Sequence, residues 1–431
     1  DSPLLPHLLR AAGGAGARRR LDGRLPLHTA AKHGALGAIG ACLDEFPEGA
    51  RQRDANGCLP LHLAVAPVSG GALAPSGEGA ASDSHAEGAR LLLAAYGRAV
   101  WEADMEGMLP LHYAAISGAS LGVVTVLLDA APESAAHEAR EGWLPLALAV
   151  VYRAPAPVVS TLLAAHPHGA AHRSEAFGCL PLHLAAKYSR ARVVRLLLDA
   201  HPDAASDVNP EELRMPLHIA AASCAEEGAI AALLEAYPPA ARAADVDGCL
   251  PLHVAVCNRA SGATVGRLLA AHPAAASITV GNGQLPLHLA SRHAACADVV
   301  QALLHAHPDG ASARSGDGYL PLHCAHEAGA RTEVVELLLR AHPGGAMQRT
   351  RYGKLPLHLL LRRSELVPER AFVSTRRATE APATQRAPLD AADAAPAAPA
   401  ARTRGAGHSD TSRTAEVVHG RQARPVGVEL T

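Results

Sequence analysis

Apolar residues recur along the chain with helical rather than alternating spacing. The run formed by Val334, Val335 and Leu337–Leu339 is one example, and residues 193–198 carry the same pattern. Such spacing predicts an amphipathic helix with one buried stripe. We expect this helix to stop at His342-Pro343, because the residue before a proline avoids the helical region and proline cannot continue the hydrogen-bond ladder.

A second, shorter helix is predicted before each such run. Its first turn carries a proline, Pro321 in this example, where the missing N–H would have no partner in any case. The polar stretch between two units ends on Asp-Gly, Asn-Gly or Glu-Gly, residues that accept positive φ in tight turns. The pattern predicts a unit of helix, helix and extended turn, and an all-α fold.

The unit recurs with a fixed phrase, Leu-Pro-Leu-His. Met215–His218 reads Met-Pro-Leu-His, Leu144–Ala147 reads Leu-Pro-Leu-Ala, and from His183 onward successive copies are 35 residues apart. A fixed period of 20 to 50 residues indicates a repeat array, in which each unit buries its apolar face against its neighbours. The histidines of this structural motif are His28, His62, His112, His183, His218, His253, His288, His323 and His358.

The repeat pattern sets the predicted domain boundaries. Residues 1–363 form the array, with a partial N-terminal repeat and about ten further repeats, and Leu213 replaces the turn glycine in one of them. The interval from His62 to His112 holds fifteen extra residues, which predicts a flexible insertion loop at 67–88. Residues 364–377 are predicted to form a short closing helix. The Ala/Pro/Thr/Arg-rich segment 378–431 is predicted to be disordered.

Composition restricts the function. Hydrophobic residues make up 49% of the chain and aromatic residues only 3%, and the net charge is −2. This balance argues against a nucleic-acid partner, and no apolar run reaches the ~20 residues that a membrane span needs. Eight cysteines without a Cys-x-x-Cys pair indicate a reduced, intracellular setting, cytoplasmic or nuclear. The chain starts without Met, inside what looks like a repeat, so we expect further residues before it.

The 25 histidines raise the possibility of metal binding. Zinc ligands lie ~2 Å from a single ion, whereas equivalent residues of adjacent repeats are ~8–10 Å apart. The motif histidines are therefore interpreted as buried imidazoles bonded to backbone. His166, His168 and His172 form the only local cluster, and no Cys or carboxylate accompanies it at matching helical offsets. The chain lacks nucleophile-elbow, phosphate-loop and metalloprotease motifs, so we predict no metal, no cofactor and no enzymatic activity.

Two sets of positions vary from repeat to repeat. One is the position after the turn glycine, and the other is the pair four and five residues after the phrase. Trp, Tyr and Arg dominate interface hot spots, so their presence there favours a contact surface, although each could instead cover local apolar surface. The protein-binding candidates are Arg24, Lys32, Trp143, Tyr152, Lys187, Tyr188, Arg292, Tyr319 and Lys354.

The phrase Pro-Leu-His-x-Ala in the first helix, Val-Val-x-x-Leu-Leu in the second and Asp-Gly in the connecting turn together resemble the ankyrin repeat. The resemblance covers roughly residues 1–363. It implies a curved α-solenoid that recognises proteins, with first helices and hairpin fingers on its concave side, where both varied sets would lie. Two features depart from the family: the period is 35 instead of 33, and Leu or Met replaces the Thr before Pro-Leu-His.

That Thr can cap the helix, a contribution of ~1 kcal/mol, whereas Leu cannot. We hypothesise that Leu285→Thr and Leu320→Thr are neutral or stabilising. A fall in melting temperature would instead show that each Leu occupies a buried place of its own.

The leading functional hypothesis is a monomeric, non-catalytic scaffold that binds a protein partner in the concave groove. A second is that the array is the regulatory arm of a larger enzyme or channel. A third is a structural spacer, in which the varied positions could be replaced by alanine without effect.

Overall fold

The computed structural model describes residues 23–66, 80–175, 178–188 and 190–364. These residues are helical and contain no strand, and isolated bridges join Ala139 with Trp143 and Val280 with Gln284. They belong to one compact unit, Asp1–Pro368. The predicted all-α solenoid is confirmed.

The first helices all start at the proline of the phrase. The Leu or Met before it is extended, for example Leu250 with φ −77° and ψ 162°, and the proline fits position N1 because it has no N–H to leave unpaired. The first helices are α3 (Pro26–Lys32), α5 (Pro60–Ala64), α7 (Pro110–Ser117), α9 (Pro145–Val151), α11 (Pro181–Tyr188), α13 (Pro216–Ala222), α15 (Pro251–Cys257), α17 (Pro286–Arg292), α19 (Pro321–Ala328) and α21 (Pro356–Ser364).

Several second helices carry the Val-Val-x-x-Leu-Leu stripe, and most end at a residue before proline, as predicted. His342, before Pro343, leaves the helical region at φ −142° and ψ 80°, as a residue before proline must. The second helices are α4 (Leu36–Glu45), α6 (Ala80–Ala95), α8 (Leu121–Ala130), α10 (Ala156–Ala165), α12 (Ala191–Ala200), α14 (Glu227–Ala236), α16 (Gly262–Ala271), α18 (Ala297–Ala306) and α20 (Thr332–Ala341).

A short 3-10 helix follows each second helix, where only a polar stretch had been predicted. In most repeats the proline that stops the α-helix opens it, and its small third and fourth residues, such as Ala240 and Ala241, are buried. One more single turn, η4, lies in a connecting turn. These elements are η1 (Pro47–Arg51), η2 (Gly97–Trp101), η3 (Pro132–Ala136), η4 (Arg140–Gly142), η5 (Pro167–Ala171), η6 (Pro202–Ser206), η7 (Pro238–Arg242), η8 (Pro273–Ser277), η9 (Pro308–Ala311) and η10 (Pro343–Met347).

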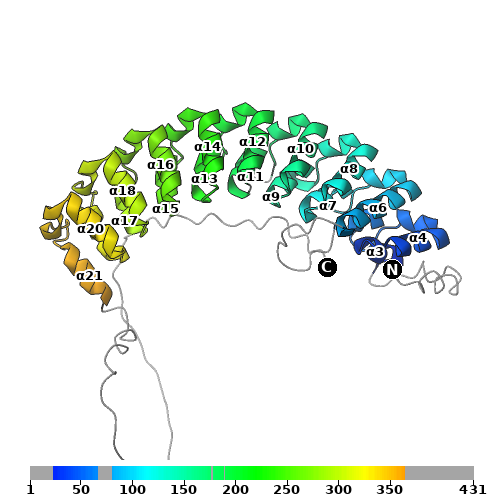
Figure 1. The fold of residues 1–431 in the computed structure, drawn as a ribbon, viewed down its shortest axis with the longest axis horizontal. Helices are drawn as coiled ribbons and strands as arrows, with labels where there is room; N and C mark the ends of the chain where they lie inside the picture. The colour runs from blue at the N-terminus through cyan, green and yellow to red at the C-terminus, as the bar shows by residue number, and fades with distance from the viewer. Residues whose placement is uncertain (1–22, 67–79, 176–177, 189, 365–431) are drawn as a thin grey trace, which may run out of the picture. The chain divides into compact units, whose positions relative to one another are not determined.

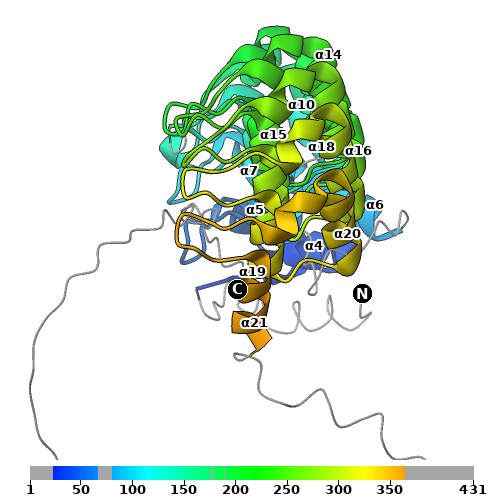
Figure 2. The same ribbon diagram turned by 90° about the vertical axis from the view of Figure 1, so that its left-hand side faces the viewer.

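The helix pairs stack side by side in an arch (Figure 1). First helices such as α11 and α13 lie on the inner side, and second helices such as α12 and α14 lie on the outer side. The turns that join repeats, here called fingers, project together to one side of the helices (Figure 2). Alanines of the first helices, such as Ala185, Ala220 and Ala255, are fully buried, so the first helices pack closely. Leu and Val of the second helices complete a core that is continuous from repeat to repeat.

Most fingers contain a glycine in the left-handed region, such as Gly248 at φ 74°. Leu213, the exception, also adopts the left-handed region at φ 51°. The turn around it is nevertheless different: Asn209 N–H bonds to Arg214 O, five positions on, whereas Asp245 N–H bonds to Cys249 O, four positions on. The repeat that lacks the turn glycine therefore has a turn one residue longer between its closing hydrogen-bond partners.

The predicted insertion loop at 67–88 is shorter at its C-terminal end. Helix α6 already begins at Ala80, because Ala-rich sequence after residue 79 continues directly into the apolar stripe of that helix. Residues 67–79 lie outside the described residues, as do the predicted partial repeat before residue 23, the closing helix after Ser364 and the tail 378–431. None of the described helices is both long and apolar enough to cross a membrane.

Candidate functional site

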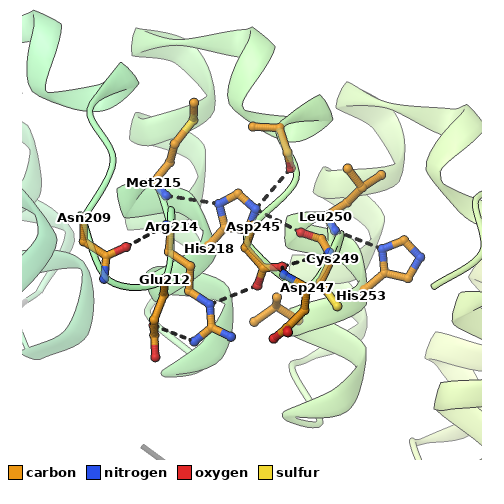
Figure 3. Close-up of polar contacts among 12 residues, drawn as sticks. Asn209, Glu212, Arg214, Met215, His218, Asp245, Asp247, Cys249, Leu250 and His253 are labelled. Carbon is orange, nitrogen blue, oxygen red and sulfur yellow. Dashed lines mark hydrogen bonds and ion pairs between the residues drawn. The ribbon is translucent and has the colours of Figure 1, made fainter. Parts of the chain in front are cut away.

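Each fully bonded motif histidine joins two repeats through both ring nitrogens. His253 Nδ1 accepts the Leu250 N–H at 3.1 Å, and its Nε2 lies 2.9 Å from Ile278 O. His218 bonds in the same way to Met215 N–H, Ala243 O and Cys249 O (Figure 3). Because Nδ1 accepts, the proton must reside on Nε2 and the ring must be neutral. The histidine therefore caps its own helix and holds the finger of the next repeat.

Burial favours this neutral state. It lowers the pKa of His62, His112 and His288 to about 4, because a charged imidazole is poorly solvated in the core. Burial also lowers the pKa of His218, against the opposing effect of Asp245. These histidines have a structural role, and within the described residues no three His, Cys, Asp or Glu side chains are placed to hold a metal ion.

One interface departs from this pattern. Neither ring nitrogen of His183 makes a well-formed hydrogen bond with a described residue, although His183 is only 1% exposed. The carbonyls of Asp207 and Arg214 are still close enough to oppose, weakly, the lowering of its pKa by burial. The finger that it faces is the longer turn, Asn209 to Arg214. Ala147, which replaces the motif histidine, faces the only comparable turn described, in which Ser174 N–H bonds to Cys179 O. Where the opposing turn has an extra residue, the motif histidine therefore makes no well-formed hydrogen bond to it or is replaced by alanine.

A buried aspartate organises several fingers (Figure 3). Asp245 Oδ1 accepts the N–H groups of Asp247 and Cys249 at 3.1 and 2.9 Å, and Oδ2 pairs with Arg214 Nε at 3.1 Å. Arg214 also binds Glu212 at 2.9 Å. The candidate Arg24 makes the equivalent pair with Asp54 at 3.2 Å. The position after the turn glycine therefore holds adjacent fingers together when arginine occupies it.

Other residues at this position belong to the core. Trp143 is 3% exposed, and Cys58 and Met108 are similarly buried. Trp143 therefore offers almost no surface to a partner in this structure, because packing between repeats covers it. Tyr319 and Lys354 remain half-buried, with one face accessible. The residues at the position after the turn glycine are therefore of two kinds, some buried between repeats and others partly accessible.

The second varied set is more accessible. Lys32, Tyr152 and Tyr188 are half-buried, and Lys187 and Arg292 are exposed. Lys187 Nζ lies 5.0 Å from the centre of the Tyr188 ring, within cation–π range.

The two varied sets meet on one face. With its amide oriented to satisfy both atoms, Gln284 accepts from the Arg292 guanidinium at 3.0 and 3.2 Å, and Gln284 occupies the position after the turn glycine. We use the name groove for the candidate contact surface made up of Tyr152, Lys187, Tyr188, Arg292, Tyr319 and Lys354.

Sequence reasoning missed two groups of arginines. Arg53, Arg173 and Arg314 lie nine or ten residues before the motif histidine and tie one finger to the next. Arg314, for instance, donates to Gly318 O, Arg349 O and Gln348 Oε1. The nearly constant distance between these arginines and the motif histidine could have identified them in the sequence. The second group, Arg153, Arg190 and Arg259, lies in the loops after the first helices, just beyond the varied pair.

The buried cysteines are poorly suited to covalent chemistry. Burial raises the pKa of the Cys58, Cys179 and Cys249 thiols to about 11, whereas the thiolate is the nucleophile. These three thiols are therefore poor nucleophiles near neutral pH.

Comparison with known protein families agrees with the geometry. The ankyrin repeat model matches residues 177–209 and 282–313, which cover the regions around α11–α12 and α17–α18. A search of curated proteins found no match.

Proposed function

We propose that this chain, in which two segments match the ankyrin repeat and support an ankyrin repeat protein, is a scaffold that binds a protein partner through the groove. Ankyrin repeats are generally protein-interaction modules and are typically non-catalytic. An intracellular setting is part of the proposal, and all eight cysteines are free.

The observation that carries the proposal is that several aromatic and cationic side chains at the varied positions remain accessible to solvent. Tyr152, Tyr188 and Tyr319 each keep one side exposed, although the chain is only 3% aromatic. Tyrosine contributes a large contact area with little loss of conformational freedom, and both tyrosine and arginine are enriched among interface hot spots. Lys187 and Arg292 lie on the same face and add charged donors.

The test is affinity capture with the whole chain, followed by Tyr188→Ala combined with Tyr319→Ala. We expect at least one captured protein to be lost or reduced about tenfold, the size of a single hot-spot effect. Tyr237→Ala is a matched control, because Tyr237 is a half-buried tyrosine at the end of the outer helix α14. Unchanged circular dichroism would show that the variants fold. Capture that survives the double substitution would contradict the groove and favour the spacer hypothesis.

A further inference from the structure

Five cations lie along one edge of a run of five repeats, four of which contribute them, whereas the middle repeat, that of α13, contributes none. They occupy the last turns of α9 to α17 and the loops that follow, and they are Arg153, Lys187, Arg190, Arg259 and Arg292. The same segments contain one carboxylate, Glu226, whose Oε2 accepts the Ala191 N–H at 3.0 Å. We call this row the basic edge.

The basic edge has no internal counter-charge among the described residues. Several other arginines are paired, such as Arg140 with Glu106 at 3.1 Å and Arg267 with Glu227 at 2.6 Å, whereas Arg192 and Arg195 of the outer helix α12 are in no ion pair among the described residues. No described carboxylate lies within ion-pair distance of any of the five cations. Arg259 and Arg292 come from adjacent repeats, and both disfavour the charged form of His293, so positive charge accumulates across repeat boundaries.

The backbone at two of these positions does not favour arginine. Arg153 and Arg259 have φ of 59° and 60°, in the left-handed region, where Gly34, Gly118 and Gly329 stand in the outer repeats. A side chain costs roughly 1 kcal/mol there compared with glycine. Both arginines are exposed. Their backbone N–H groups bond to Val150 O and Val256 O, as any residue's would, but no described residue forms a hydrogen bond with either guanidinium, so the fold does not explain the choice of arginine.

The opposite ends of the same first helices have the opposite charge. Exposed carboxylates stand in the fingers at Glu141, Glu175, Glu211 and Asp247. A first helix of seven or eight residues separates finger from loop by roughly 11 Å. The same fingers hold Arg140 and Arg173, which are paired with Glu106 and Asp207. The finger rim therefore leaves mainly carboxylates unpaired, whereas the opposite rim, with Tyr152 and Tyr188, carries the unpaired cations.

We propose that the basic edge binds an acidic, extended polypeptide segment of the partner. This inference rests on the proposed function and specifies the partner's chemistry. Repeats are spaced by about 8–10 Å, and every third residue of an extended chain advances by about the same distance. Carboxylates at such positions would meet successive cations, while apolar side chains between them cover the tyrosines. The acidic fingers disfavour nucleic acid and anionic membranes, which carry negative charge over a broader surface.

The test uses the whole chain and a fluorescein-labelled peptide of about 15 residues with Glu at every third position and Leu or Phe between. The reference is the same peptide with Gln in place of Glu. Fluorescence anisotropy should show that the acidic peptide binds about tenfold more tightly at ~50 mM salt, with most of this difference lost at ~300 mM.

Three variants assign the binding to the basic edge. Arg153→Glu with Arg259→Glu should weaken binding of the acidic peptide about tenfold. Arg153→Gly with Arg259→Gly removes the same charges and relieves the backbone, so it should also weaken binding without lowering the melting temperature. Arg192→Glu with Arg195→Glu, at exposed positions of the outer helix α12, should change binding less than about twofold.

Equal binding of the Glu and Gln peptides would overturn the proposal. So would a single-stranded oligonucleotide or anionic vesicles that bind as tightly and lose binding in the same variants, since the edge would then be a general polyanion surface. If Tyr188→Ala with Tyr319→Ala abolishes partner capture while both Arg153/Arg259 variants retain it, the scaffold function stands and the acidic segment is refuted. Loss of capture in the arginine variants, with the outer-helix control unchanged, supports both.

Discussion

Two neighbouring interfaces, α11 with α13 and α13 with α15, differ although both contain the motif histidine. At the second, His218 bonds to its own helix and to the following finger. At the first, His183 is equally buried but makes no well-formed hydrogen bond with a described residue. The opposing turns differ by one residue in their closing hydrogen bond. The histidine therefore stabilises an interface only when the next finger presents its carbonyls in register.

Acid should weaken both interfaces, and this is the largest effect that we expect. The pKa of the motif histidines is lowered in the folded state, to about 4 for His62, His112 and His288, so the unfolded chain binds protons first as the pH falls. Stability is complete above about pH 6.5 and is lost as the pH falls toward 4, by up to ~1.4 kcal/mol per pH unit for each histidine. Urea unfolding at several pH values measures this slope. A flat profile between pH 7 and 5 would contradict it.

Removing the ring should distinguish the two interfaces. His218→Ala should cost ~3 kcal/mol, because it creates a cavity and leaves buried backbone groups unpaired. His183→Ala should cost nearer ~1 kcal/mol, since it removes volume but no well-formed hydrogen bond. Chemical unfolding followed by hydrogen exchange gives both values and locates the affected repeats. Equal losses would show that His183 is bonded in solution.

The residue before each Pro-Leu-His can be tested in the same way. Leu320 is 0% exposed and Leu285 4%, so the hypothesis of neutral or stabilising Leu→Thr substitutions conflicts with the packing. We expect Leu320→Thr to lower stability by ~2 kcal/mol, because the lost apolar contact and the buried hydroxyl outweigh a cap of ~1 kcal/mol. Met215, in the repeat with the longer turn, is only half-buried, so Met215→Thr should cost less. Thermal melts compare the two, and an unchanged Leu320→Thr would restore the original hypothesis.

The smallest effect concerns the longer turn itself. Leu213 is left-handed and 48% exposed, so Leu213→Gly should stabilise the α11–α13 interface by ~0.5 kcal/mol. Leu213→Ala keeps the strain and serves as the control. A melting temperature that rises equally in both variants would point to the exposed leucine rather than to the backbone.

The roles of the candidate-site residues could be predicted from the sequence only in part. The motif histidines were expected to be buried and bonded to backbone, and their geometry agrees in the bonded repeats. The varied position after the turn glycine was expected to contact a partner. Arg24 instead pairs with the buried Asp54, and Trp143 lies in the core. Their exposure depends on the adjacent finger about 30 residues away, which local pattern does not encode.

The sequence alone determined the repeating helix pair, the proline at which each first helix begins, the residue before proline at which most second helices end, and the structural role of the motif histidines. These follow from proline, glycine and apolar spacing, which act within a few residues. Only the tertiary structure decided which varied side chains remain accessible, which histidine lacks its bonds, and that five cations share one edge. Those properties arise between repeats, where one residue more or less in a turn changes which backbone and side-chain atoms meet.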